Sequence, residues 1–296
     1  MSKRLTYTRT LALATLVACT LAAAACGTSD VGRIDDPAAN GGGANGGGAN
    51  ADGGANAEGG ANADALGSDP DGTASTDANG ATDTKPATTY VSLKTAGDFV
   101  VLAGSAITST GLTVVNGNVG ISPGTAITGF PPGVVNGTIH IADAVAAAAK
   151  KDLNDAYTDA AGRVGPPVTL AGDLGGLTLG PGLYFSASSL GLDSGNLTLD
   201  AAGNEDAIWV FQIGSSFVTS PSRQVILVGQ ARADNVFWNV GTSTTIGLGC
   251  TVVGNFLTQV SITANAGTTL EGRFLTQTGA VTLDPSTTIN RPKPVH

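Results

Sequence analysis

Short runs of Val, Ile, Leu and Thr, separated by Gly, Asn, Asp or Pro, fill the sequence from residue 87 onward. Apolar and polar positions alternate within these runs, as in Ala280–Leu283, and each run is typical of a brief strand that ends at a turn. The block Gly254–Gln259 returns as Gly272–Gln277 after 18 residues. This spacing predicts a β-solenoid in which turns of three short strands stack at about 4.8 Å.

One segment has a different period. From Ile139 to Arg163, apolar residues that include Val145 and Leu153 recur every three or four positions, which predicts an amphipathic helix. Gly162 and the following Gly-Pro-Pro sequence favour its end there. A helix of about 24 residues is about 36 Å long, close to the height of about six or seven stacked turns. We therefore predict a mainly β fold with this helix packed along the solenoid.

The first 25 residues have the pattern of an export signal. Three basic residues precede the apolar run Leu11–Ala25, which ends in small residues at Cys26. This arrangement resembles a bacterial lipoprotein signal, in which the cysteine becomes the acylated first residue. Cys19 also fits that pattern, but polar sequence begins only after Cys26, so we expect acylation at Cys26 and a lipid-anchored place in the bacterial cell envelope. Ordinary secretion with cleavage nearby is the alternative.

Residues 26–86 are rich in Gly, Ala, Asn and Asp, and an Ala-Asn step recurs between glycine pairs. Such a composition predicts a disordered tether. A Gly-rich coil of this length has a root-mean-square span of about 45 Å. The sequence is therefore expected to divide into a signal (1–25), a tether (26–86) and one folded domain (87–296).

The composition of the chain argues against several classes of function. The net charge of −9 gives no electrostatic footprint for nucleic acid. Three Cys and two His, His140 and His296, provide no recognisable zinc or redox motif, so we expect no metal and no cofactor. No apolar stretch after residue 26 is long enough to cross a bilayer. The acidic residues of the domain outside the helix are scattered, unlike the paired carboxylates of a polysaccharide-active enzyme.

Several blocks between about Leu93 and Ile289 resemble the microbial ice-binding protein family. They are Phe99–Ser105, Asn116–Gly124, Thr128–Gly133, Leu174–Tyr184, Val210–Gly214 and Asn235–Trp238. The resemblance implies a discontinuous right-handed β-solenoid flanked by one long helix. It also implies a protein that is not an enzyme and that adsorbs to ice through one flat face of the solenoid.

Strand alternation predicts which side chains form that face. If Ile262 and Ala264 point into the core, Ser261, Thr263 and Asn265 point outward. Neighbouring turns then place hydroxyls about 4.8 Å apart, and alternate residues of one strand add about 6.7 Å, which is a grid on the scale of an ice lattice. The same reasoning applied along the domain gives the predicted ice-binding residues Thr108, Thr128, Thr198, Thr219, Ser243, Thr245, Ser261, Thr263, Asn265 and Thr282.

Other interpretations stay open. The ice face could instead carry Thr251, Thr269 and Thr287. A surface adhesin or structural solenoid that binds a protein or glycan would share the same tether and fold, and threonine is in any case common on solvent-facing strands. We expect the partners to be an ice surface and, through the anchor, a membrane, and we expect a monomer that does not bind nucleic acid.

Overall fold

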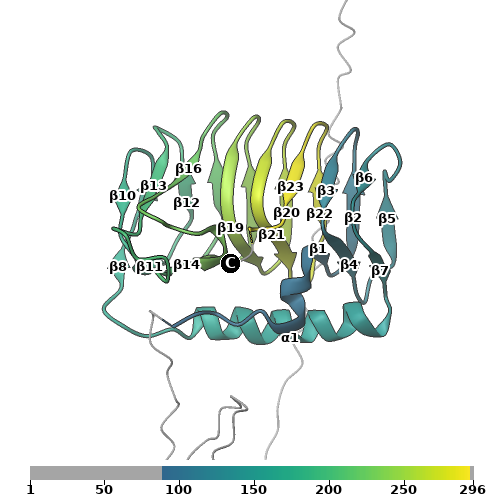
Figure 1. The fold of residues 1–296 in the computed structure, drawn as a ribbon, viewed down its shortest axis with the longest axis horizontal. Helices are drawn as coiled ribbons and strands as arrows, with labels where there is room; N and C mark the ends of the chain where they lie inside the picture. Colours follow the sequence, from purple (N-terminus) through teal and green to yellow (C-terminus); the bar gives the residue numbers. More distant parts are fainter. Residues whose placement is uncertain (1–88, 294–296) are drawn as a thin grey trace, which may run out of the picture. The chain divides into compact units, whose positions relative to one another are not determined.

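Parallel strands build residues 89–293, the part of the chain that the computed structural model describes. The predicted signal, Cys19, Cys26, the tether and His296 lie outside these residues. Within them the strands stack into a solenoid with one long helix, α1, alongside, as the sequence indicated (Figure 1). The eight-stranded sheet has one strand from each turn, so the stack has eight turns rather than six or seven.

The turns do not stack in the order of the chain. The first turn, which begins with β1, pairs on one side with β4 and on the other with β21 near the C-terminus. Its second strand, β2, likewise lies between β5 and β22. The solenoid is therefore discontinuous: the last turn of the chain lies between the turns that precede it and the first one.

The strands form three faces. The threonine face, named for the residues described below, is made in spatial order by β5 (Ala126–Thr128), β2 (Ala106–Ser109), β22 (Val281–Leu283), β20 (Ser261–Ala264), β18 (Ser243–Ile246), β15 (Phe217–Thr219), β12 (Leu190–Leu192) and β9 (Gly172–Asp173).

The helix-covered face is made by β7 (Ile139–Ile141), β4 (Asn118–Ile121), β1 (Phe99–Ala103), the second halves of β21 (Thr269–Thr276) and β19 (Thr251–Thr258), β17 (Val236–Val240), β14 (Trp209–Ile213), β11 (Gly182–Ser186) and β8 (Val168–Thr169).

The third face is made by β6 (Val134–Val135), β3 (Val114–Asn116), β23 (Thr288–Asn290), the first halves of β21 and β19, β16 (Val225–Val228), β13 (Leu197–Asp200) and β10 (Thr178–Leu179).

The repeated block of the sequence begins at the corner between the third and the helix-covered faces. Gly254 and Gly272 are paired in register where β19 and β21 bend from one face to the other. Gly254 has a φ of 106°, and a Cβ at Gly272 would lie 1.9 Å from the carbonyl oxygen of Gly254. The bend therefore requires glycine at this step of each turn.

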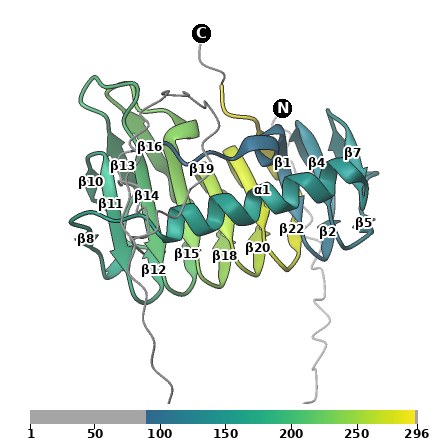
Figure 2. The same ribbon diagram turned by 90° about the horizontal axis from the view of Figure 1, so that it is seen from below.

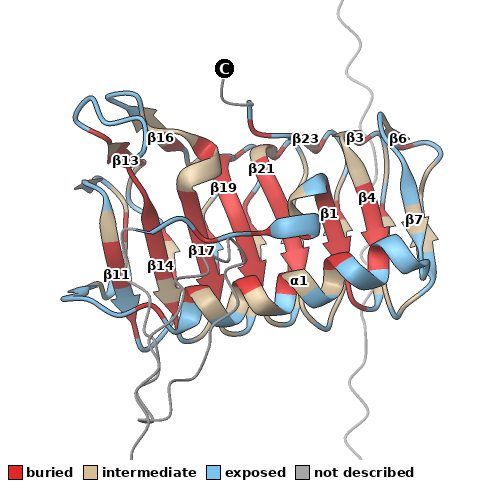
Figure 3. Ribbon diagram, turned by 60° about the horizontal axis from the view of Figure 1, so that its bottom comes forward, coloured by how far each residue is buried: buried red, intermediate tan, exposed pale blue. Residues whose placement is uncertain are grey.

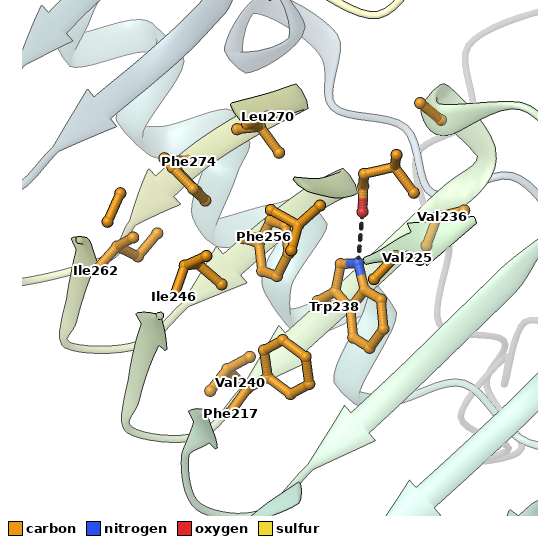
Figure 4. Close-up of a cluster of buried hydrophobic side chains, with 14 of the residues drawn as sticks. Phe217, Val225, Val236, Trp238, Val240, Ile246, Phe256, Ile262, Leu270 and Phe274 are labelled. Carbon is orange, nitrogen blue, oxygen red and sulfur yellow. Dashed lines mark hydrogen bonds between the residues drawn. The ribbon is translucent and has the colours of Figure 1, made fainter. Parts of the chain in front are cut away.

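Aromatic side chains fill the interior. The rings of Tyr184, Phe211, Trp238 and Phe256 stack from turn to turn, and the closest pair, Phe211 and Trp238, has ring centroids 4.1 Å apart. The indole N–H of Trp238 donates to the carbonyl of Val253 at 2.9 Å (Figure 4). These rings are core residues, and each fully buried one contributes roughly 2–3 kcal/mol of hydrophobic free energy.

The helix is shorter than predicted. α1 spans Ala144–Ala161, and Ile139–Ile141 pair with β4 as strand β7 instead. Asp143 caps the helix, because its Oδ1 accepts the N–H of Ala146 at 2.8 Å. The prediction that Val145 faces the core is wrong, since its side chain is 51% exposed, whereas Leu153 is fully buried as expected.

His140 lies on β7 and makes local contacts. Its ring meets Phe99 edge-on, and its Nδ1 is 2.7 Å from Oδ2 of Asp143. The N–H of Ala146 and the His140 ring together lower the pKa of the Asp143 carboxyl below its ordinary value.

A strap, residues 89–98, crosses the helix-covered face beside α1 and ends in the short helix η1 (Lys94–Asp98) (Figure 3). Arg163 binds its start through the carbonyl oxygens of Thr89 and Tyr90, and Arg273 binds its end through the carbonyl of Gly97 at 3.1 Å. Val91, in the strap itself, is fully buried and belongs to the same apolar cluster as Leu153 of the helix. Helix and strap together cover this face, so it is closed to a flat ligand.

Candidate functional site

Five threonines form one straight column on the threonine face. They are paired in register across five consecutive turns, so each side chain has its counterpart on the adjacent strand. Figure 2 shows these strands side by side next to α1. In spatial order the column is Thr128, Thr108, Thr282, Thr263 and Thr245.

The column points outward because inward positions between its members fill the core. Ile107 and Ile262, which precede Thr108 and Thr263, are fully buried. Thr244 is the inward residue of β18, and its hydroxyl is satisfied by that of Thr258 at 2.9 Å. The face is thus one side of a sheet whose other side is packed, which holds its backbone in place.

A second column runs beside the first, two residues earlier in each strand. Small residues occupy it throughout: alanine on the turns of β5, β2 and β22, and serine on those of β20, β18, β15 and β12. Only two members, Ser243 and Ser261, are among the residues predicted from the sequence, although the same two-residue offset gives the others. The column is Ala126, Ala106, Ala280, Ser261, Ser243, Ser216 and Ser189.

The two columns make a regular and rigid surface. Adjacent strands place equivalent residues about 4.8 Å apart, and the columns are about 6.7 Å apart. The β-branched threonines have few side-chain rotamers, so little conformational entropy is lost when they are held by a partner. No Lys or Arg lies in either column. The surface can therefore present ordered methyl and hydroxyl groups to a flat partner.

The threonine column stops at β15. The next positions are Val218, Gly191 and Asp173. A Cβ at Gly191 would lie 2.4 Å from Oδ2 of Asp193, so that carboxylate covers the position. The far end of the face is thus acidic and irregular.

Asp173 holds the backbone of the next turn. Its carboxylate accepts the N–H groups of Gly175, Asp193 and Ser194 at 2.7–2.8 Å. The Ser194 side chain and these N–H groups lower the pKa of Asp173 far below its usual range, so the carboxylate is ionised at neutral pH. Its role is to tie adjacent turns together.

Two predicted outward residues do not belong to this face. Thr219 is 4% exposed: its hydroxyl accepts the N–H of Gly247 at 2.8 Å and lies 3.2 Å from the Cys250 sulfur. Val218 points outward in its place because Phe217 packs against Trp238 in the core, which shifts the alternation by one residue. Thr198 faces outward, but it belongs to β13 on the third face.

The alternative face also changes in detail. Thr251 and Thr269 are in register on the third face, but their partner is Thr288, since Thr287 is fully buried. The next positions along that column are Val114 and Val134. A ladder of amide hydrogen bonds lies beside it, from Asn136 to Asn116 at 2.7 Å and from Asn116 to Asn290 at 2.8 Å. This face has three threonines in a row.

Among residues 89–293, no three His, Cys, Asp or Glu side chains lie close enough together to bind a metal ion. Cys250 is buried beside Thr219. No helix of the same residues is long and apolar enough to cross a membrane. The regular feature of this part of the chain is the threonine face.

Known proteins resemble this chain over most of the described domain. A family model described as ice-binding-like matches residues 101–290. An ice-binding protein from Nostoc sp. (strain HG1) is 45% identical over 211 residues, which cover 71% of this chain and 77% of the relative. An ice-binding protein from Colwellia sp. is 37% identical over 217 residues, which cover 68% and 84%.

Solved structures agree with these sequence matches. The crystal structure of an ice-binding protein from an Antarctic biological consortium matches with a TM-score of 0.69 and 47% identity over 71% of this chain and 95% of that one. An ice-binding protein from the Antarctic ascomycete Antarctomyces psychrotrophicus matches with a TM-score of 0.67 and 38% identity, covering 70% and 100%. In sequence and in fold, the chain belongs to the ice-binding-like family.

Proposed function

We propose that the protein binds ice through the threonine face. The observation that carries this proposal is the in-register column of five threonines on five consecutive turns, flanked by a column of small side chains. The names of its relatives, which are ice-binding proteins, agree with it. The contact residues are Thr108, Thr128, Thr245, Thr263 and Thr282, with Ser243, Ser261, Ala106, Ala126 and Ala280 beside them.

Adsorption to ice requires no covalent bond to form or break. The threonine methyl leaves the neighbouring water in a cage-like arrangement, and the hydroxyl hydrogen-bonds into that arrangement as both donor and acceptor. Each contact is weak, so affinity comes from many contacts made together. A side chain that protrudes from the plane should therefore separate the whole face from the lattice.

The test compares two tyrosine variants of one solenoid turn. Thr263 lies on β20 in the middle of the threonine column, and Thr269 begins β21 of the same turn on the third face; both are partly exposed. Thr263→Tyr should abolish most of the thermal hysteresis, the gap between the melting and freezing temperatures of an ice crystal. Thr269→Tyr should retain it. Circular dichroism and melting should match the parent for both, because exposed strand positions tolerate tyrosine.

Each other result has a definite meaning. Loss of hysteresis in Thr269→Tyr alone would move the ice face to the third face. If the parent domain neither shows hysteresis nor shapes ice crystals, ice binding is refuted and an adhesin takes its place.

We propose in addition that the mature protein is monomeric and acylated at Cys26, and that residues 27–86 tether the domain to the cell envelope. The order of basic residues, apolar run and small residues before Cys26 supports export and acylation, and the Gly-, Ala- and Asn-rich composition of residues 27–86 supports the tether. Mass spectrometry of the mature protein should find a lipid on an N-terminal Cys26. An unmodified N-terminus beyond Cys26 would refute the anchor and leave secretion.

A further inference from the structure

A carboxylate stands at the border of the threonine face. Leu283 pairs with Ser109 and Ala264, so the next residue, Asp284, lies between Thr110 and Asn265. The backbone ladder continues through it, since the Asp284 N–H donates to the carbonyl of Ala264 at 2.9 Å. These three residues form a third column, two positions beyond the threonines on β2, β22 and β20.

The Asp284 side chain is held in this column. The hydroxyl of Thr110 donates to its Oδ1 at 3.0 Å. Within residues 89–293, no Lys, Arg or His side chain lies within ion-pair distance of the Asp284 carboxylate. Water must therefore supply its remaining hydrogen bonds, and removing that water from an ionised group is costly.

An ionised carboxylate also mismatches the hydrogen-bond pattern of ice. Each water molecule in ice donates two hydrogen bonds and accepts two, whereas the carboxylate only accepts. Every water molecule that touches Asp284 must therefore point a hydrogen toward it. The neighbouring Thr110 hydroxyl and Asn265 amide both donate and accept, so they would fit the pattern.

We infer that Asp284 sets the border of the ice-contact surface: its charge confines contact to the first two columns and keeps Thr110 and Asn265 out of it. The inference rests on the proposed function and makes Asn265 a border residue instead of a contact residue. A neutral residue at 284 widens the contact to three columns on β2, β22 and β20.

The chain provides a matched control. Asp193 occupies the corresponding position on β12's turn, and the Ser220 hydroxyl donates to its Oδ1 at 2.7 Å. It lies beside Gly191 and Val218, where the threonine column has ended. Neutralising Asp193 therefore changes the net charge of the protein by the same amount without changing the proposed border.

The experiment measures thermal hysteresis at equal protein concentration for Asp284→Asn, Asp284→Glu and Asp193→Asn. Asp284→Asn should raise hysteresis beyond the spread between replicate preparations. Asp284→Glu keeps the charge and should give no gain, and Asp193→Asn should match the parent. Asn265→Ala, which removes the amide without protruding from the face, should change hysteresis little in the parent but should reduce the gain in the Asp284→Asn background. Melting curves check that every variant is folded.

Two results would overturn the inference. One is a folded Asp284→Asn variant with the hysteresis of the parent. The other is an equal gain in Asp193→Asn, which would assign the effect to net charge. Failure of the proposed function is distinguishable, because it would appear as a parent without hysteresis or a Thr263→Tyr variant that retains it.

Discussion

At the scale of single residues, Val218 marks the limit of the threonine column. It is 41% exposed and lies in register with Thr245, one turn beyond the fifth threonine. Val218→Thr keeps the β-branched shape and adds one hydroxyl to the row, so we expect hysteresis to rise. Stability should change by no more than about 0.5 kcal/mol, because the site is at the surface. Hysteresis and thermal melting measure the two effects.

Thr219, the next residue, gives the contrasting variant. Thr219→Val removes the hydroxyl that pairs with the buried N–H of Gly247, which should destabilise the fold by about 1–3 kcal/mol without lengthening the column. A Val218→Thr variant that folds like the parent but shows no gain in hysteresis would contradict the proposed extension of the face.

At the scale of elements, α1 docks through a narrow row of small and apolar residues. Leu153 is fully buried in this row, while Val145, eight residues earlier, is half exposed. Leu153→Asp should place an unpaired charge in the apolar cluster that also contains Leu257 and Leu275 and destabilise the fold by about 3 kcal/mol or more. Val145→Asp should change stability by less than about 0.5 kcal/mol. Chemical denaturation of both variants measures the difference.

Polar side chains of the sheet would still hold a helix that had lost Leu153. The side-chain amides of Gln212, Asn239 and Gln277 donate to carbonyl oxygens of α1 at 2.9–3.0 Å. The Gln212 amide also donates to the carbonyl of Arg163, just beyond the end of the helix, at 3.2 Å. Equal melting of Leu153→Asp and the parent would mean that these hydrogen bonds, not apolar burial, carry the docking.

At the scale of the whole molecule, the sequence predicted the solenoid and the helix because each produces a regular spacing of residues that can be recognised in the sequence. It also predicted the inward and outward positions of β18, β20 and β22, because the inward apolar residues Ile246, Ile262 and Val281 fix the alternation. The one-residue shift in the alternation that turns Val218 outward and Thr219 inward depends on a contact between Phe217 and Trp238, which come from different turns. The helix start depended on the pairing of Ile139–Ile141 with β4. Contacts between separate strands produce no periodic pattern in the sequence, so the sequence alone could not predict them.

The discontinuous stack also makes the order of synthesis differ from the order of assembly. Thr110 and Asp284, which meet across β2 and β22, are 174 residues apart in the chain. β1, β2 and β3 each pair with a strand near the C-terminus, namely β21, β22 and β23. Until those strands have been synthesised, each of the first three strands lacks one of its two neighbours. Pairings across so long a separation form slowly. The threonine column is thus assembled from both ends of the domain, and it becomes continuous only after the last turn has left the ribosome.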